Sequence, residues 1–372
     1  MKFSIEKNDL VQALGNVHGV VEARTTIPIL SNVMIRAEAG EIHLATTDMD
    51  MAMVERKPAR ISIDGSLTVP VRTFYEIIKK LPDGAQINLE QDSNTGQLNI
   101  NAGQASFHLP TLPADDFPVL SEGEFDHHFH LDSKQLHHLI ETTRFAISME
   151  ETRYYLNGIY MHILQEGETA QLATVATDGH RLAKAVTEAP EGSEALAGVI
   201  VPRKAINELH HLLNQHEGTV EIAVSDSKIR FAIAGAILTT KLIDGKFPDY
   251  ARVIPTNNDQ CLTIACKLFG KSVDLVQTIA SDKVRAVKME ISTNKLVLSA
   301  SAQENGAARQ ELECEYSGSE LAIGFNARYL LDMTQQIGSG ELSMLFANST
   351  APALIKNPND KNILFVLMPM RV

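Results

Sequence analysis

The chain of 372 residues has few cysteines, no long apolar run and none of the common catalytic motifs. Its three cysteines, Cys261, Cys266 and Cys314, are an odd number without C-x-x-C spacing, so we expect neither a disulfide framework nor a zinc site. We interpret Cys261 and Cys266 as packing residues, and the cysteine usage favours the reducing cytoplasm. No stretch approaches the ~18 apolar residues of a membrane span, and the charged start MKFSIEKNDL is no signal peptide. We therefore expect no membrane partner.

Motifs that bind nucleotides or activate a serine are missing. The sequence contains no G-x-x-x-x-G-K-[ST], G-x-G-x-x-G or G-x-S-x-G. The stretch HHFHLDSKQLHH could suggest a metal centre, because His128 and His130 would share a strand face and His137 and His138 would follow on a helix. No Cys or carboxylate completes a ligand set at the usual spacing. We expect a surface cluster of histidines, no metal and no cofactor.

An excess of basic residues is also missing. The formal net charge is -13, which by itself argues against nucleic-acid binding. A net charge can hide a local arrangement, however, and basic residues fall on predicted helix faces. Lys79 and Lys80 follow one apolar stripe, and Arg203 and Lys204 begin another. Ordinary solvated helices explain them as well as contact with phosphates does.

The sequence does contain one pattern three times. A short alternating strand runs into an amphipathic helix in KFSIEKNDLVQALGNV, HFHLDSKQLHHLIETT and CLTIACKLFGKSVDLVQTI. Each is followed by a predicted hairpin, and then by a second strand and helix in TVPVRTFYEIIKKLPDG, IVPRKAINELHHLLNQHEG and AIGFNARYLLDMTQQIGSG. We predict an α+β protein of three similar tandem domains, each with two helices packed on antiparallel sheet. The domain bounds would be 1–125, 126–253 and 254–372, with Pro-rich linkers near 113–118 and 248–255.

The stretch TVATDGHRLAKA, residues 174–185, looks like a catalytic site because Asp178, His180 and Arg181 stand close together. Its counterpart in the first domain, LATTDMDMAM, carries Asp48 at the position of Asp178 but no histidine. A repeated turn, in which the Asp side chain bonds its own backbone, explains both copies. We therefore expect no catalytic residue, and keep a hydrolase that uses Asp178 and His180 as the alternative.

The end of the sequence, FVLMPMRV, is rich in methionine and aliphatic residues. A final strand tucked into a sheet explains ILFVL but not MPMRV. Because the methionine thioether is flexible and polarizable, such a segment can adapt to several partners.

These motifs carry a resemblance. The chain resembles the family of bacterial DNA polymerase III beta subunits, the replicative sliding clamps, from MKFSIE to VLMPMRV, through TIPILSN, TLPADDFP, RYYLNG, ATDGHRLA, VPRKA, DGKFPDY, IGFNARYLLD and MPMR in the family's order. The resemblance implies a DNA clamp fold in which two chains form a head-to-tail, six-domain ring. It also implies a non-catalytic processivity factor that contacts duplex DNA without sequence preference and slides along it.

The resemblance further implies a set of functional residues. A partner-peptide pocket between the second and third domains would comprise Leu156, Thr177, Gly179, His180, Arg181, Leu182, Pro248, Arg252, Val253, Val366, Met368, Pro369, Met370 and Arg371. DNA contacts would be made by Arg24, Arg153, Tyr154, Tyr155, Arg203 and Lys204, and the dimer seam by Phe107, Leu109 and Ile279. The segment AQENGAARQELE, residues 302–313, holds fewer acids than the family pattern leads us to expect, which bears on the strength of the dimer.

The partners that the resemblance implies are double-stranded DNA, the polymerase III catalytic subunit, an ATP-driven clamp loader and a second copy of the chain. Other DNA polymerases, ligase and mismatch-repair proteins would bind through short peptide motifs. A scaffold that binds peptides but never encircles DNA is a further alternative.

Overall fold

The computed structural model of the protein describes residues 1–22, 24–118, 123–167, 169–280, 285–302 and 306–371. The chain divides into two compact units. The first comprises Met1–His137, Pro190–Leu196 and Val201–Leu242, and the second His138–Ala189, Ala197–Ile200 and Ile243–Val372. None of the described helices is long and apolar enough to cross a membrane.

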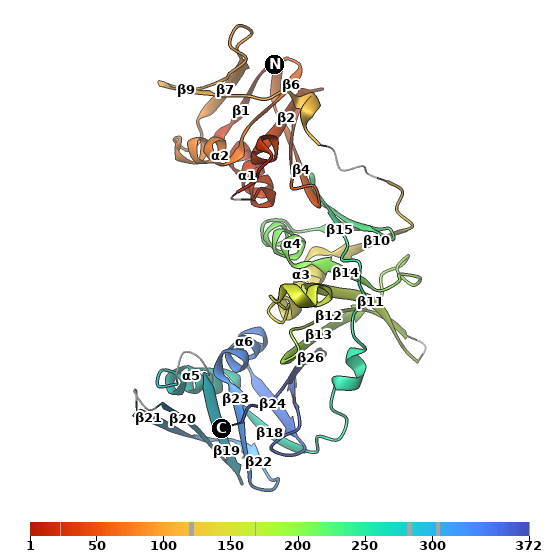
Figure 1. Ribbon diagram of the computed structural model, residues 1–372, viewed down its shortest axis with the longest axis vertical. Coiled ribbons are helices and arrows are strands. Elements are labelled where there is room, and N and C mark those ends of the chain that lie inside the picture. Colours follow the sequence, from red (N-terminus) through yellow and green to blue (C-terminus); the bar gives the residue numbers. More distant parts are fainter. Residues whose placement is uncertain (23, 119–122, 168, 281–284, 303–305, 372) are drawn as a thin grey trace. The chain divides into compact units, whose positions relative to one another are not determined.

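Six α-helices lie in the described residues, and each follows directly on a strand (Figure 1). They are α1 (Lys7–Val17), α2 (Val71–Lys80), α3 (Ser133–Arg144), α4 (Arg203–Gln215), α5 (Cys266–Gln277) and α6 (Ala327–Ile337). Their apolar stripes are buried as the periodicity predicts: Leu10, Phe74, Leu136 and Leu209 have no exposed surface. Asp132 caps α3, because its Oδ1 accepts hydrogen bonds from the backbone N–H groups of Lys134 and Gln135.

The first unit contains two antiparallel sheets. One has the order β5-β1-β7-β8-β9, with bounds Arg60–Ile63, Lys2–Glu6, Gln86–Gln91, Leu98–Ala102 and Ala105–Leu109. The other has the order β10-β15-β16-β17-β4-β3-β2-β6, with bounds His127–Asp132, Thr219–Val224, Lys228–Ile233, Ala236–Lys241, Met51–Pro58, Glu41–Thr47, Asn32–Glu38 and Gly65–Pro70.

The second unit also contains two. The longer has the order β14-β11-β12-β13-β26-β25-β24-β18-β22, with bounds Val199–Pro202, Gly158–Glu166, Thr169–Thr177, Arg181–Glu188, Asp360–Leu367, Ala353–Asn357, Glu341–Phe346, Gln260–Ala265 and Glu315–Tyr316. The shorter has the order β21-β20-β19-β23, with bounds Gly306–Glu313, Lys295–Ala302, Ala286–Ser292 and Leu321–Asn326.

The threefold repeat predicted from the sequence is confirmed. Each copy runs strand, helix, three strands, strand, helix, three strands, apart from the extra strands β5 and β22. Antiparallel strand pairing joins the copies, because β4 pairs with β17 and β13 pairs with β26. The fourth strand of one copy therefore lies beside the last strand of the next. The domain bounds at 125 and 253 stay a prediction, since the two compact units divide the middle copy differently.

The two linkers form short helices and bury aromatic side chains. Each contains a short 3-10 helix, η3 (Ala114–Asp116) in the first and η5 (Tyr250–Val253) in the second. Phe117, Phe247 and Tyr250 are buried against the sheets that the linkers cross. The cysteine prediction is partly wrong: Cys266 is buried and packs as expected, but Cys261 is exposed, because it faces outward on β18.

Candidate functional site

The stretch that looked catalytic is a turn between β12 and β13. The Asp178 Oδ1 accepts hydrogen bonds from the backbone N–H groups of His180 and Arg181, at 2.9 and 3.0 Å. The Thr177 hydroxyl donates to the Arg181 carbonyl at 2.7 Å and accepts from the Gly179 N–H at 3.1 Å. The side chains of Thr177 and Asp178 thus hold the backbone in place, as expected for an Asx turn.

The first domain holds a twin of this turn between β3 and β4. The Asp48 Oδ1 accepts from the N–H groups of Asp50 and Met51, and the Thr47 hydroxyl donates to the Met51 carbonyl. Met49 has φ 79°, where Gly179 has φ 88°. A repeated turn accounts for the Thr-Asp pair, and the family comparison below gives the hydrolase alternative no support.

Arg181 is committed to contacts inside the protein. Its guanidinium donates to Asp178, to the carboxylate of Asp332 on α6 and to the carbonyl of Phe145. It also stacks over the rings of Phe145 and Tyr329, at 5.0 and 4.2 Å from the centroids. Only 9% of the side chain is exposed. This guanidinium holds the second repeat to α6 of the third and uses each of its three nitrogens in a contact within the protein.

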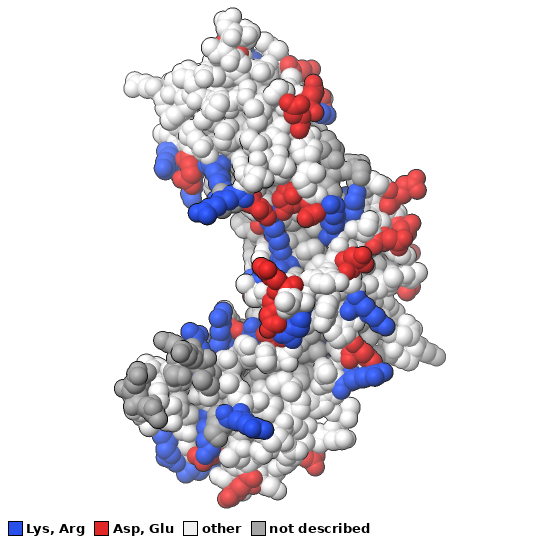
Figure 2. Space-filling view, viewed as in Figure 1, with Lys and Arg blue, Asp and Glu red and all other residues white. Residues whose placement is uncertain are grey.

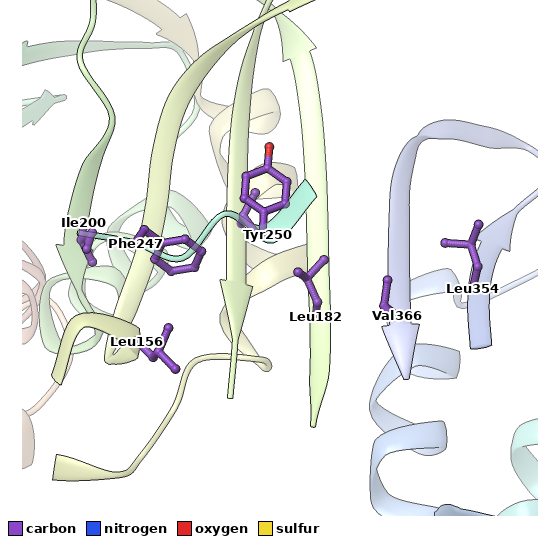
Figure 3. Close-up of a cluster of buried hydrophobic side chains, with 8 residues drawn as sticks. Leu156, Leu182, Ile200, Phe247, Tyr250, Leu354 and Val366 are labelled. Atoms are coloured by element: carbon purple, nitrogen blue, oxygen red, sulfur yellow. The ribbon is translucent and has the colours of Figure 1, made fainter. Parts of the chain in front are cut away.

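Beside the turn lies an apolar cluster, here called the Phe247 cluster (Figure 3). Its members are Leu156, Val175, Leu182, Ile200, Phe247, Tyr250, Leu354 and Val366. Leu182 on β13 and Val366 on β26 are direct partners across the seam between the second and third repeats. The cluster therefore brings together three of the predicted peptide-pocket residues, Leu156, Leu182 and Val366.

Exposed apolar side chains lie on the segments that carry this cluster. Tyr154 is 54% exposed, Val253 52% and Met368 44%, which is unusual for side chains of this size. Pro248 and Arg252 are also exposed, and Arg252 pairs with Asp249 at 2.6 Å. The surface is thus apolar and accessible, with one cation that is already balanced.

The chain end is anchored. The Met368 N–H donates to the His180 carbonyl at 2.9 Å, and the Met370 N–H donates to the Gly324 carbonyl at 2.7 Å. Pro369, Met370 and Arg371 line one depression with Ile323, Gly324 and Thr350. The segment that follows β26 is therefore an ordered wall, which joins the turn of His180 to β23.

A buried histidine supports the second linker. The ring of His162 stacks on Tyr160, with centroids 4.4 Å apart, and its Nε2 lies 2.9 Å from the Tyr250 hydroxyl. Tyr160 stacks in turn on Phe247 at 4.8 Å. Burial, with a smaller contribution from Lys184, lowers the pKa of His162 to about 4. The ring is therefore neutral at pH 7 and forms part of the packing under the linker.

The residues predicted to contact DNA are placed differently from one another. Arg24 is exposed. Arg153 pairs with Glu150 and lies against Gly179, where an added Cβ would come within 2.6 Å of its guanidinium. Tyr155 packs against the Phe247 cluster, while the Tyr154 ring is largely exposed. Arg153 and Tyr155 thus lie at the candidate peptide surface, whatever their contact with DNA.

On α4, the predicted lining residues begin the helix. The Lys204 Nζ binds the Asp48 carboxylate and lies 3.7 Å from Glu22, and Arg203 has a buried Nη1 without a hydrogen-bond partner. Near α1 and α2, Figure 2 shows basic side chains standing beside acidic ones. Lys204 is therefore balanced by neighbouring carboxylates, which limits how strongly it can hold a phosphate.

Two of the predicted seam residues, Phe107 and Leu109, lie on an edge strand, and the third follows a helix. Phe107 is 36% exposed on β9, the edge strand of its sheet, and lines a depression with Ile77 and Leu81. Leu109 is 6% exposed and packs within its own domain. Ile279 is half-buried, just beyond α5. Phe107 and Ile279 are accessible, whereas Leu109 has little surface to offer a partner.

The sequence reasoning missed several members of the site. Val175, Ile200, Phe247 and Leu354 belong to the Phe247 cluster, and Asp332 holds Arg181. One signal could have found Phe247, because Phe-Pro occurs in both linkers, at Phe117 and at Phe247. The other contacts join segments far apart in the sequence and leave no local pattern.

Comparisons with known proteins place the chain. Family models for the N-terminal, central and C-terminal domains of the DNA polymerase III beta subunit match residues 1–121, 130–249 and 251–371. The chain belongs to the family of bacterial DNA polymerase III beta subunits, the sliding clamps. A beta sliding clamp of Caulobacter vibrioides is 47% identical over 372 residues, and one of Escherichia coli K12 is 35% identical over 378; each alignment covers 100% of both chains.

Solved structures agree. A crystal structure of the Bartonella birtlesii sliding clamp bound to griselimycin has a TM-score of 0.97 and 45% identity, covering 100% of both chains. A Caulobacter crescentus beta sliding clamp has a TM-score of 0.97 and 47% identity, covering 100% of this chain and 99% of that one. Membership in this family makes the chain a clamp for DNA polymerase III, a processivity factor and not an enzyme.

Proposed function

We propose that two copies of this chain join head to tail into a six-domain ring around duplex DNA. The strand-pairing rule carries the proposal. The fourth strand of one repeat pairs with the last strand of the next at β4 with β17 and at β13 with β26. By the same rule, β21 should pair with β9, yet both are edge strands within the chain. A second copy, placed head to tail, supplies both missing partners.

The proposed partner site is the surface over the Phe247 cluster. Extended peptides with bulky apolar side chains would bury Tyr154, Val253 and Met368, and the backbone at Gly179 allows close approach. His180, Pro248, Arg252 and the segment Pro369, Met370 and Arg371 would form its walls. Arg181 would act from beneath, by holding the turn to α6.

Contact with DNA is proposed for Arg24, Arg153, Tyr154, Tyr155, Arg203 and Lys204. Contacts of basic side chains with phosphates carry no sequence information, which suits a ring that must slide. The proposed partners are the polymerase III catalytic subunit, a clamp loader, other polymerases, ligase and mismatch-repair proteins. We propose a cytoplasmic location, which the bacterial origin of its relatives supports.

The peptide site can be tested by fluorescence polarisation with a labelled Gln-Leu-Asp-Leu-Phe peptide. We expect binding in the micromolar range by the intact chain. Removal of Met370, Arg371 and Val372 should abolish it, because the wall beside Gly324 is lost. Val253→Asp should weaken binding about tenfold or more, since a carboxylate would be buried against an apolar ligand.

Leu275→Asp is the matched control, because Leu275 is 62% exposed on α5 and lies outside the proposed site. Binding that survives both the truncation and Val253→Asp would remove the site assignment. Hydrolysis of an ester or peptide that disappears with His180→Ala would revive the hydrolase alternative, and a single-chain mass at all concentrations would favour the scaffold that never closes.

A further inference from the structure

A cavity lies at the other seam of the chain, between the first and second repeats within the first unit. It has a volume of about 220 Å³ and opens beside the first linker. Phe117 of the linker, Ala45 and Ala52 on β3 and β4, and Ile237 and Thr239 on β17 are among its lining residues. We call it the Phe117 pocket.

This pocket is built like the Phe247 cluster. Phe117 occupies the place of Phe247 in a linker that crosses the seam, and both are buried. Ala52 pairs with Thr239 across the first seam, as Leu182 pairs with Val366 across the second. Residues 119–122, which follow in this linker, lie outside the described residues.

Smaller side chains at the repeated positions open the cavity. Ala45 stands where Val175 stands in the second repeat, Ala52 where Leu182 stands, and Thr239 where Val366 stands. The two alanines remove side-chain volume from this place, while Thr239 replaces a methyl group by a hydroxyl of similar size. The second seam fills this place with its own residues, whereas the first leaves room for apolar groups from outside.

The rim differs in charge. Arg36, Arg56, Arg230 and His43 line the Phe117 pocket, and its described lining includes no Asp or Glu. Arg230 binds Glu221 at 2.9 Å and stacks over Phe125 at 5.0 Å, so it is held in place. Arg36 is 3.9 Å from Glu38, and Arg56 is exposed with no ion pair to any described residue. At least one cation at the rim is thus available to a carboxylate.

We propose that the Phe117 pocket is a second peptide-docking groove, which takes a short acidic segment with one or two bulky apolar side chains. The apolar floor of Met34, Val54 and Phe117 would receive Leu or Phe, and the arginines would bind neighbouring Asp or Glu side chains. The proposal rests on the proposed function in one respect only, namely that a linker Phe packed at a seam between two repeats forms a site that binds peptides. The chemistry of the rim gives the groove its own specificity.

The test is fluorescence polarisation with a labelled Asp-Asp-Leu-Phe-Asp-Glu peptide and the full-length protein. The double change Arg36→Ser and Arg56→Ser should weaken binding roughly tenfold. Ala52→Leu, which installs the residue of the second repeat, should fill the floor and weaken binding by about as much. Arg60→Ser, an exposed arginine on β5, is the matched control and should change affinity less than about twofold.

The two sites are separated by two further measurements. Removal of residues 370–372 should leave binding of the acidic peptide unchanged. Gln-Leu-Asp-Leu-Phe binding and the thermal midpoint should be unchanged in the Arg36, Arg56 and Ala52 variants, which shows that they fold. Should Gln-Leu-Asp-Leu-Phe bind no variant at all, the proposed function fails, while the acidic peptide still tests the Phe117 pocket.

Three outcomes would overturn the proposal. The first is that the acidic peptide does not bind the intact chain. The second is that it binds equally well after Ala52→Leu and after the double arginine change. The third is that its binding is lost when residues 370–372 are removed. A photo-crosslinkable Phe analogue in the peptide locates the contact directly: crosslinks within β3, β4 or β17 support the groove, and crosslinks confined to β13 or β26 contradict it.

Discussion

Gly179 and Met49 occupy the same place in two copies of one turn. Both have a positive φ, of 88° and 79°, a backbone conformation that costs a side-chain-bearing residue free energy. Met49 in the first copy is strained in this conformation, whereas Gly179 in the second copy is not. Comparison of the two turns shows what the glycine provides. It presents a backbone without a side chain at the surface beside Arg153.

We expect Gly179→Ala to lower the free energy of unfolding by about 1 kcal/mol, because alanine is strained at this φ. It should also weaken binding of Gln-Leu-Asp-Leu-Phe, since the new methyl group displaces the Arg153 side chain. Met49→Gly is the matched exchange at the twin turn and should leave peptide binding unchanged. Urea denaturation and fluorescence polarisation measure the two effects. Equal loss of peptide affinity in both variants would contradict the assignment.

The buried ring of His162 makes stability depend on pH. Its pKa in the folded protein, about 4, lies below the unfolded value of 6.5, so the unfolded chain binds the proton more tightly between these two values. The stabilisation is complete above pH 6.5 and is lost as the pH falls toward 4, by up to about 3 kcal/mol.

Urea denaturation of the intact chain and of His162→Gln at pH 7, 5.5 and 4.5 tests this. Burial also lowers the pKa of His211 and His216, so the intact chain and the variant share their contribution. The variant should lose less stability than the intact chain over this range. Parallel pH profiles would show that His162 is not the responsible group.

At the scale of helices and strands, pairing between strands of neighbouring repeats joins the parts of the chain. The sheets run without interruption from one repeat into the next through β4 with β17 and β13 with β26. The two ends of this series, β9 and β21, are edges. An edge strand with an exposed aromatic residue such as Phe107 is a template for pairing with another chain.

Phe107→Asp should shift the protein from a dimer toward a single chain of 40.8 kDa, because a carboxylate would be buried in the seam. The chain offers a close control in Ile63→Asp. Ile63 is 55% exposed on β5, the opposite edge strand of the same sheet. Sedimentation velocity at several concentrations measures the mass. Dissociation by both changes, or by neither, would argue against a seam at β9.

The sequence predicts the elements well and their partners poorly. Apolar periodicity predicts α1, α2 and α3, and the repeat predicts three copies, because both signals are local or copied along the chain. The pairing of Leu182 with Val366 and the bond from Arg181 to Asp332 join positions more than 100 residues apart. No spacing encodes such contacts. The resemblance implies the members of the proposed peptide surface, but of the Phe247 cluster beneath it only Leu156, Leu182 and Val366.

For the whole molecule, charge limits how DNA is held. The net charge is -13, and Lys204 is already paired with Asp48 and Glu22. Direct attraction to phosphates is therefore expected to be weak and easily screened by salt. Retention on DNA must come mainly from enclosure by a closed ring.

We expect weak binding to a short linear duplex that is lost by about 200 mM NaCl. Protein loaded on a nicked circular plasmid by a clamp loader and ATP should stay bound at that salt concentration. Cutting the plasmid with a restriction enzyme should release the protein from the DNA. Co-elution with the plasmid in gel filtration is the measurement. Equal retention on circular and cut plasmid would show that affinity, and not enclosure, holds the protein.

The seams also say what a single repeat could do alone. Each repeat has a fourth strand that can pair with the last strand of a neighbour, and a last strand that can pair with the fourth strand of another. One repeat cut from the chain would carry both halves of this joint and expose them together. It would polymerise with copies of itself, as closed rings or as open filaments according to the rotation at each joint. Fusing three repeats into one chain fixes two joints per chain covalently, so a ring of two chains keeps only two joints that can open.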